Sequence, residues 1–356
     1  MTVKEIACFL DSLAEDEILE LIKLIRLKSP RNVETLVYEA SGRPKCPVCG
    51  KEMVKNGKTP GKAQKRICKK CKVSSSTNTN KLTFKTKLKA VHWIKMYEAF
   101  NNGFSLRKTA ELCHVSLPTA FYCRHKLFKA MGKSLERSIL TDRIEIDGKQ
   151  ERISFKGAKK EKIPRVSKKR GGGTGKADPK ERLNAIFAVD GSDKMIGKIT
   201  GVGREDHKQI DKVTHYFKNI KRLVTDDNSA YIKYARIFNS EHIHINSSVK
   251  FDPATGETLN IVNSLMSEFD TFMSKFRGVS SRHLQGYIDA YLFQKDLKYR
   301  IEEPEIVKVG IRKCLSVDKT RIKNSDIVSE KFPVNLYEIF KGHAGWADSI
   351  LAQYYQ

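Results

Sequence analysis

Apolar side chains in the N-terminal third of the chain recur every three or four residues, which is the spacing of one face of an α-helix. The pattern runs through residues 1–30, where Ser29-Pro30 provides a stop signal. It returns in residues 81–131, first from Leu88 to Phe100 and then from Phe104 to Met131. We therefore predict one or two short helices at the N-terminus and a helical domain further along the chain.

A different pattern begins at Arg143, where β-branched residues and alternation favour strands. We predict strands at residues 143–147 and 222–225, and a hairpin at residues 183–200 with its turn at Asp190-Gly191. Helical spacing returns at residues 207–219, 259–276 and 283–293. Strands and helices that alternate in this way predict an α/β core.

These patterns divide the chain into five segments. They are an N-terminal helical segment at 1–40, a Lys- and Gly-rich segment at 41–80, a helical domain at 81–138, the α/β core at 139–300, and a C-terminal region of unknown role at 301–356. Inside the core, residues 156–176 contain Lys168, Lys169 and Arg170 followed by three glycines. This composition predicts a mobile basic loop.

The net charge of the chain indicates a polyanionic binding partner. The chain has 67 Lys and Arg against 41 Asp and Glu, a formal charge of +26 at pH 7. An excess of this size is typical of proteins that bind nucleic acid. No window approaches the run of about 18 apolar residues that a membrane-spanning helix needs, and residues 1–6 lack the layout of a signal peptide. We expect a cytoplasmic, prokaryotic protein with no membrane partner.

Four of the eight cysteines form two Cys-x-x-Cys pairs, Cys46 with Cys49 and Cys68 with Cys71. The segment that holds them has too few large apolar side chains to build a hydrophobic core. Four thiolates at this spacing match a tetrahedral Zn²⁺ ion, whose binding free energy replaces the missing core. We predict one structural zinc ion in a zinc ribbon. Two disulfides are the alternative, which a reducing cytosol disfavours.

The ribbon is also strongly basic. The side chains that we expect to contact DNA phosphates are Lys65, Arg66, Lys69 and Lys70. A purely structural ribbon, whose lysines only solvate it, is the alternative.

Residues 105–124 have the layout of a helix-turn-helix. Ala110 is small where two helices would cross, and His114 falls at the tight turn. Ser116 is placed to cap a second helix whose first turn accepts Pro118. The side chains expected to face a DNA groove are Thr119, Tyr122, Arg124, His125 and Lys126. An ordinary helical hairpin that packs into the core is the alternative.

Two aspartates stand where predicted strands end. Asp147 closes the strand at 143–147, and Asp226 follows the strand at 222–225. A hairpin and a helix lie between them, an order that would place the two strands side by side in a ribonuclease-H-like sheet. Carboxylates that converge from separate segments can hold divalent cations for phosphodiester chemistry. Asp227 and Glu145 are alternative ligands, and an Asp before Gly, as at 147, is more often a turn former.

Taken together, these motifs resemble the DDE-type insertion-sequence transposases of the ISXO-two-like branch, over roughly residues 30 to 300. The zinc ribbon and the helix-turn-helix stand at the front, as in that family. Ile146-Asp147-Gly148 is similar to the first catalytic motif, and Thr225 to Tyr231 to the second, in which Thr-Asp is followed shortly by Tyr. The segment from Gly256 to Ser264 resembles the third, and places Asn263 at the position of the third catalytic residue.

The resemblance implies a ribonuclease-H-like core in which Asp147, Asp226 and Asn263 hold two Mg²⁺ or Mn²⁺ ions. It implies a nucleoid-associated enzyme that binds terminal inverted repeats, cleaves double-stranded DNA and joins 3′ ends to target DNA as a homodimer or larger homo-oligomer. The ribbon, the helix-turn-helix and the basic loop with Lys168, Lys169 and Arg170 would contact the repeats. Thr258 stands where the family has His, Met266 where Trp is usual and Asp270 where it has Lys.

Two other functions fit parts of the sequence. A non-catalytic, sequence-specific DNA-binding protein would have the same charge, ribbon and helix-turn-helix. A ribbon protein associated with the ribosome or RNA polymerase would explain the charge and the zinc but not the paired aspartates.

Overall fold

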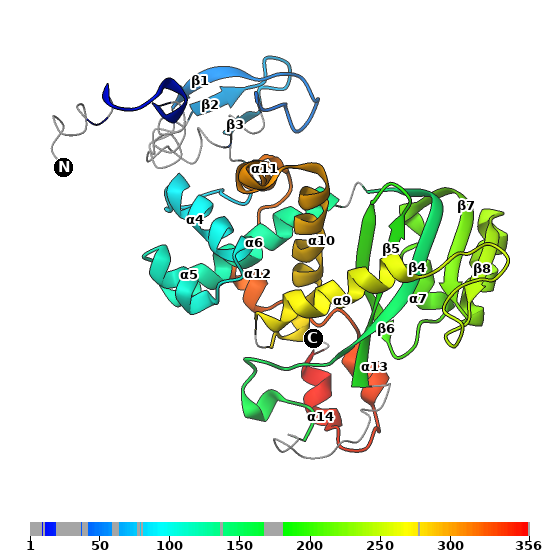
Figure 1. Cartoon of the computed structure of the whole chain (residues 1–356). Helices are drawn as coiled ribbons and strands as arrows, with labels where there is room; N and C mark the ends of the chain where they lie inside the picture. Colours follow the sequence, from blue (N-terminus) through cyan, green and yellow to red (C-terminus); the bar gives the residue numbers. More distant parts are fainter. Residues whose placement is uncertain are drawn as a thin grey trace.

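The computed structural model describes residues 9, 11–18, 37, 42–58, 64–76, 79, 81–135, 138–166, 181–276 and 278–354. In chain order these residues form a small three-stranded sheet, a group of helices, and a five-stranded sheet with helices on both faces (Figure 1). The predicted α/β class is therefore confirmed. Most of the predicted N-terminal helices lie outside the described residues, apart from a helical turn at residues 15–18.

The five-stranded sheet is mixed and has the order β6-β5-β4-β7-β8. Its strands are β4 (Leu140–Arg152), β5 (Arg182–Asp190), β6 (Met195–Val202), β7 (Phe217–Asp226) and β8 (Glu241–Ile245). Strand β5 runs antiparallel to both β4 and β6, whereas β7 and β8 continue the sheet parallel to β4. The predicted hairpin between β5 and β6 is confirmed. The carboxylate of Asp190 closes its turn by accepting the N–H groups of Ser192 and Lys194 at 2.8 and 3.0 Å.

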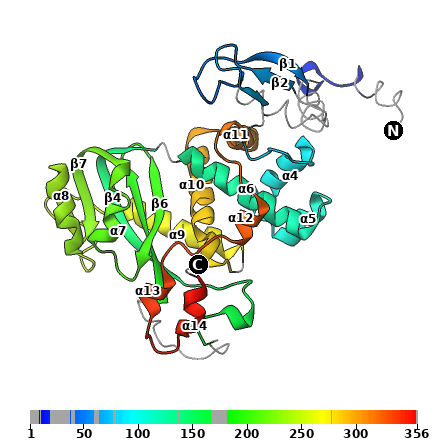
Figure 2. The ribbon, with the colours of Figure 1, turned by 180° about the vertical axis from the view of Figure 1, so that it is seen from behind.

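Alternating side chains divide the sheet into two buried faces. On β4 and β5, Ile144, Ile146 and Ile186 pack toward one core, which α7 (His207–Asp211) and α8 (Ile232–Phe238) cover. The opposite face packs against α9 (Asn260–Ser274) and α10 (Leu284–Arg300), where Phe187 contacts Phe269. The two helical layers can be followed from behind in Figure 2.

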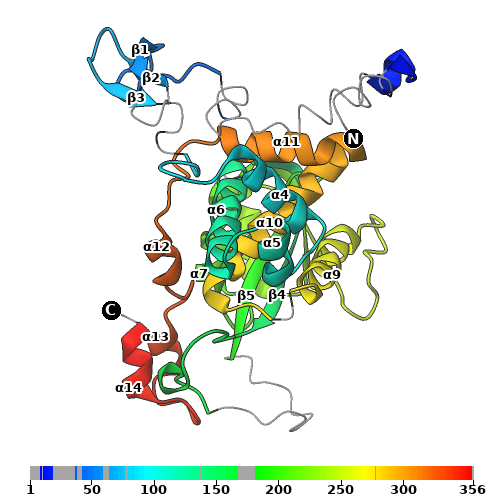
Figure 3. The ribbon, with the colours of Figure 1, turned by 90° about the vertical axis from the view of Figure 1, so that its left-hand side faces the viewer.

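The group of helices contains α4 (Ala90–Asn101), α5 (Leu106–Leu112) and α6 (Leu117–Leu135), close to the bounds that the periodicity predicts. The hydroxyl of Ser105 caps α5 by accepting the N–H of Lys108 at 3.2 Å. His114, at φ 51°, makes the turn into α6. Helix α6 packs along α10, with Phe128 against Tyr287 at 4.8 Å between ring centroids (Figure 3).

One predicted helix is shorter than expected. The pattern at residues 207–219 predicts a helix throughout, but α7 ends at Asp211, a 3-10 turn covers Thr214–Tyr216 and β7 begins at Phe217. Phe217 pairs with Leu140 of β4, and both side chains are buried in the same core. Pairing within the sheet therefore outweighs the local helical spacing.

The C-terminal region packs against the start of the predicted basic loop. It contains α11 (Glu303–Ser316), α12 (Asn324–Val328), α13 (Leu336–Phe340) and α14 (Asp348–Leu351). The N–H of Ala347 donates to the carbonyl of Pro164 at 2.6 Å, and Trp346 stacks on Phe340 with 3.7 Å between ring centroids. The loop up to Val166 is therefore fixed, whereas Lys168, Lys169 and Arg170 lie outside the described residues. Within the described ranges, no helix combines the length and apolar character needed to cross a membrane.

Candidate metal centres

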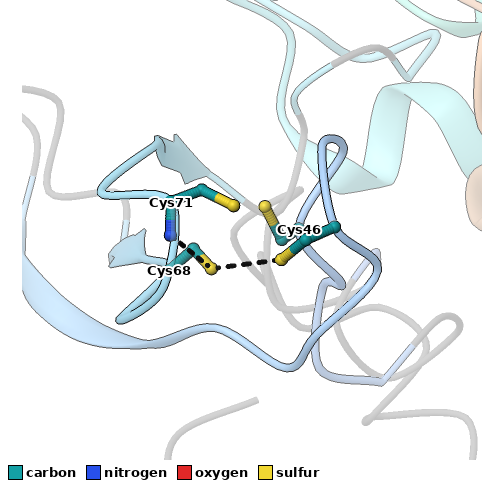
Figure 4. A group of neighbouring side chains, drawn as sticks. Cys46, Cys68 and Cys71 are labelled. Carbon is teal, nitrogen blue, oxygen red and sulfur yellow. Dashed lines mark hydrogen bonds between the residues drawn. The ribbon is translucent and has the colours of Figure 1, made fainter.

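The first candidate centre is the cluster of four cysteines beside the three-stranded sheet of β1 (Val54–Lys58), β2 (Gln64–Ile67) and β3 (Ser74–Ser76). Cys46 and Cys68 each begin a tight knuckle, because the carbonyl of each accepts an N–H from four residues further on, Gly50 and Lys72, at 2.9 Å. The four sulfur atoms lie within 4.8 Å of one another. Figure 4 shows the sulfurs of Cys46, Cys68 and Cys71 turned toward a common point.

The chemistry of this cluster fits a zinc ion. A hydrogen bond from the backbone of Lys51 lowers the pKa of Cys49 to about 7, so that one thiolate forms readily. The crowded sulfurs raise the pKa of Cys71 to about 12, first through its hydrogen bond with Cys49. Such crowding is relieved when a dication replaces the shared protons. The four cysteines are therefore a possible tetrahedral zinc site.

The basic side chains of the ribbon do not all face outward. Lys65, Lys69 and Lys70 are exposed, as their predicted role requires. Arg66 is only 5% exposed and belongs to the interior of the ribbon. The prediction that Arg66 contacts DNA is therefore at odds with its burial.

A similar correction applies to α6. Arg124, predicted to face a groove, is 4% exposed, and its guanidinium donates to the carbonyl of Phe104 at 2.7 Å and to the hydroxyl of Thr109 at 3.1 Å. It ties α6 to α5 from the inside. His125 is also buried, and burial lowers its pKa to about 3, with His283 adding to the shift. The remaining predicted groove residues, which are partly exposed, are Thr119, Tyr122 and Lys126.

The second candidate centre lies where β7 ends beside the middle of β4. Glu145 of β4 pairs with Val224 of β7 in parallel register, so two residues further along Asp147 and Asp226 come side by side. The predicted pair of aspartates is thus brought together by the sheet. Glu205 joins them from the segment between β6 and α7, and carboxylate oxygens of the three residues lie within 4.8 Å of one another. We call these three residues the carboxylate cluster.

Gly148 makes room for Glu205. A Cβ atom at this position would lie 2.2 Å from a carboxylate oxygen of Glu205 and 3.0 Å from the side-chain oxygen of Asn184. Gly148 lies within β4 rather than in a turn. The Asp147-Gly148 pair therefore does not form the turn that such a dipeptide most often marks, and the glycine allows a carboxylate to approach the strand closely.

Buried amide side chains fix the segment that carries Glu205. Gln209 donates to the carbonyls of Val202 and Arg204 at 3.2 and 3.1 Å, and its own oxygen accepts a bond from Asn184 at 2.9 Å. Asn228, two residues after Asp226, donates to the carbonyl of Glu205 at 3.0 Å. These bonds tie the end of β6 to the end of β7.

The turn after β7 orients Asp226. Its Oδ1 accepts the N–H of Asn228 at 3.1 Å, and the side-chain oxygen of Asn228 accepts the N–H of Ala230 at 3.0 Å. Asn228 thereby caps the short helical turn Ser229–Tyr231. The segment from Thr225 to Tyr231 is thus a compact turn. It orients the carboxylate of Asp226 and holds the backbone of Glu205.

The electrostatics of the cluster favour a bound cation. Burial raises the pKa of Asp147 to about 7, and the negative charges of Asp226 and Glu205 add to the effect. Tyr231 is fully buried beside the cluster, and its hydroxyl has no hydrogen-bond partner among the described residues. Burial, followed by the charges of Glu205, Asp147 and Asp226, raises the pKa of Tyr231 well above its usual range. Oxygen-rich, negatively charged sites of this kind suit Mg²⁺ or Mn²⁺.

The positively charged side chain of Arg204 faces the carboxylate cluster. Arg204 belongs to the same segment as Glu205. Its Nη2 atom lies 3.1 Å from Oδ2 of Asp226 and 3.5 Å from Oδ1 of Asp227. Asp227, the predicted alternative ligand, is 54% exposed in its side chain and stands at the rim.

Asn263 lies in the first turn of α9, on an exposed position. Glu145 anchors this turn to β4, because its carboxylate accepts the N–H groups of Ile261 and Val262, both at 3.0 Å. Asp270 lies on the same side of α9 as Asn263, seven residues further on, and accepts a bond at 2.8 Å from Lys149, two residues after Asp147. Helix α9 therefore runs along the strand that carries Asp147, with Asn263 on the side that faces Lys149.

Two acids near the start of α9 have structural partners. Glu145, a predicted alternative ligand, is fully buried and pairs with Arg143 at 2.8 Å. Glu257, which precedes α9, accepts bonds from Arg143 at 2.9 Å and from Arg222 at 2.8 Å. These ion pairs hold the entry of α9 against β4 and β7, so Glu145 and Glu257 act in anchoring.

Sequence reasoning missed Glu205. Glu205 stands in the stretch Gly203-Arg204-Glu205-Asp206, between a predicted strand and a predicted helix. An acidic side chain just before a helix is most simply explained by its favourable interaction with the helix N-terminus. Only the packing of that turn over Gly148 brings its carboxylate to the two aspartates. No model of a known protein family matches the chain, and no curated protein matches it either.

Proposed function

We propose that this protein is a DNA transposase whose ribonuclease-H-like core cleaves phosphodiesters with two divalent cations held by the carboxylate cluster. The observation that carries the proposal is the meeting of Asp147, Asp226 and Glu205 within 4.8 Å, from three separate segments. Buried carboxylates that converge in this way are costly for folding unless a cation binds them. A catalytic role explains why the chain retains them.

The sheet supports the same proposal. An antiparallel unit of β6, β5 and β4 continues into parallel strands β7 and β8, which agrees with the ribonuclease-H-like core that the family resemblance implies. The first two aspartates of the resemblance fall on the adjacent strands β4 and β7, which brings both carboxylates to one site where they could share cations.

In this function the residues of the chain have distinct roles. Asp147 and Asp226 would hold the cations from the sheet, Glu205 would close the site from the opposite layer, and Asn263 would add an uncharged amide oxygen from α9. Bound divalent cations would activate the attacking water and neutralise the leaving oxygen.

Binding of transposon ends is assigned to the N-terminal half of the chain. The exposed lysines Lys65, Lys69 and Lys70 would contact phosphates, and α5 with α6 would act as a helix-turn-helix that presents Tyr122 and Lys126. Pairing two ends in one complex requires at least two copies of the chain.

The test is cleavage of a duplex that carries the DNA flanking the gene on either side. Asp147→Asn, Asp226→Asn and Glu205→Gln should each lower Mg²⁺-dependent strand cleavage at least about a thousandfold while leaving duplex affinity unchanged. Asp142→Asn is the matched control, since Asp142 lies on the same strand, is exposed and has φ 65°, a conformation that Asn accepts. It should cleave normally.

Two outcomes would contradict this function. Cleavage that persists in all three variants would show that the carboxylate cluster does not catalyse it. Tight and specific duplex binding with no cleavage by the unaltered protein would instead support a non-catalytic DNA-binding protein.

A further inference from the structure

Arg204 stands next to Glu205 in the chain, but its side chain is not fixed as that of Glu205 is. Its backbone carbonyl is held by Gln209 at 3.1 Å, and the residue before it, Gly203, is bonded through its N–H to Arg182 at 3.0 Å. The side chain of Arg204 is 60% exposed, whereas Glu205 is buried. A rigid backbone therefore carries a guanidinium that can turn.

The guanidinium of Arg204 is held by two ion pairs with carboxylates. Its Nη2 atom makes an ion pair with Asp226 at 3.1 Å and with Asp227 at 3.5 Å. Arg204 also counters the charges that raise the pKa of Asp147. The guanidinium thus acts as the counter-charge of an otherwise strongly negative cluster. Exposed pairs of this kind are weak, so the contact is easily exchanged.

The same carboxylate oxygens are the ones that a divalent cation needs. Oδ1 of Asp226 already accepts the N–H of Asn228, and Oδ2 is the atom that Arg204 holds. A positive guanidinium next to a bound dication is unfavourable by Coulomb's law. Its planar set of N–H donors matches a phosphate diester, which carries the opposite charge.

We infer that Arg204 alternates between two partners: it neutralises Asp226 while the cluster lacks cations, and it contacts the DNA phosphate next to the scissile bond once they are bound. This role rests on the proposed function. It makes Arg204 a substrate-contacting residue whose contact with DNA depends on cation binding, and it predicts opposite effects of one substitution on two measurements.

The first measurement is the binding of Mn²⁺ alone, followed by electron paramagnetic resonance in the absence of DNA. Arg204→Gln should bind Mn²⁺ about five- to tenfold more tightly than the unaltered protein, because a competing positive charge is removed. Arg236→Gln is the matched control, since Arg236 is an exposed arginine on α8, in the same helical layer, and should leave Mn²⁺ affinity unchanged.

The second measurement is the salt dependence of duplex binding. With Ca²⁺ present, Arg204→Gln should reduce the slope of log affinity against log salt by about one phosphate contact. Without divalent cations the slope should not change, because Arg204 is then occupied by Asp226. In Asp226→Asn the guanidinium is released, so adding Arg204→Gln to that variant should reduce the slope even without cations.

The outcomes separate this inference from the function on which it rests. Mn²⁺ affinity that is equal or weaker in Arg204→Gln, or a slope change that is the same with and without Ca²⁺, would overturn the role of Arg204 alone. An unaltered protein that binds Mn²⁺ no better than Asp147→Asn would overturn the cation site, and with it the proposed function.

Discussion

The cysteine cluster and the carboxylate cluster are two candidate metal sites in one chain, and they are built in opposite ways. The four cysteines come from one short segment, whose two knuckles are closed by local backbone hydrogen bonds. The three carboxylates come from β4, from the end of β7 and from the turn after β6, far apart in the sequence. The first site consists of a local motif, and the second exists only when the sheet has formed.

This difference predicts how each site depends on its metal. In the described part of the ribbon, the buried apolar cluster is small and centres on Cys46, Met53 and Cys68, so the folding of the ribbon should depend on zinc. The carboxylate cluster lies on a sheet with large apolar cores on both faces, so that sheet should fold with or without cations. We therefore expect metal binding to stabilise the first site, whereas the fold itself assembles the second.

The largest expected effect is the loss of the ribbon when one thiol is removed. Cys68→Ser should abolish zinc binding, because a structural site with three thiolates loses most of a binding free energy of about 10 to 16 kcal/mol. Metal analysis should find one zinc per chain in the unaltered protein and none in the variant. Hydrogen exchange should become fast in residues 42–76 and stay slow in β4, β5 and β7.

Lys69→Ser is the control for this change, because Lys69 lies in the same knuckle and is exposed. It should retain zinc and protection. A Cys68→Ser protein that keeps its zinc, or that loses protection in the five-stranded sheet as well, would break the comparison.

A smaller effect is expected at Glu145, which anchors α9. Glu145→Ala leaves Arg143 without one of its carboxylates and two N–H groups of α9 without their acceptor. Removing one partner of a buried ion pair costs about 3 to 5 kcal/mol. Chemical denaturation should show a loss of this size in the unfolding free energy.

The control for Glu145 is again Asp142→Asn, whose exposed pair with Lys221 should contribute less than about 1 kcal/mol. Glu145→Gln keeps an acceptor for the helix and should fall between the two. A fully stable Glu145→Ala protein would show that α9 is not held by this carboxylate.

The smallest and most specific effect concerns the pH dependence of stability. Burial, with Asp226 and Glu205, raises the pKa of Asp147 to about 7, above its value of 3.8 in an unfolded chain. Between about pH 4 and pH 7 the folded protein therefore keeps a proton that the unfolded chain has lost. The unfolding free energy should fall as pH rises through this window, by at most about 4 kcal/mol.

Asp147→Asn removes this titration, so the difference in unfolding free energy between variant and unaltered protein should grow from pH 4 to pH 7 without added Mg²⁺. Saturating Mg²⁺ at pH 7 should reduce that difference, because the cation replaces the proton. A difference that does not vary with pH would mean that Asp147 is not buried among like charges.

Much of the fold was predictable because its signals are local. Helical periodicity gave α4, α5, α6 and α9 nearly within their bounds, and Asp190-Gly191 gave the hairpin turn. The periodicity also gave the start of α10, which continues to Arg300, beyond the predicted end at residue 293. The helix expected up to residue 219 ends at Asp211 instead, and β7 begins at Phe217. Phe217 pairs with Leu140, which belongs to a strand far away in the sequence, so the local pattern does not indicate this pairing. The burial of Arg66 and Arg124 could not be predicted from the sequence either, because the sequence of a basic segment does not indicate which of its side chains point inward.

The sequence alone determined the four cysteines of the candidate zinc site and the two aspartates of the carboxylate cluster, because spacing within a knuckle and the position of an acid after a strand are properties of short segments. Tertiary structure alone decided that Glu205 joins those aspartates, that Gly148 makes room for it and that Glu145 and Glu257 anchor α9 instead. Those choices depend on which turns and strands pack across the sheet, and packing between distant segments leaves no pattern in any one of them.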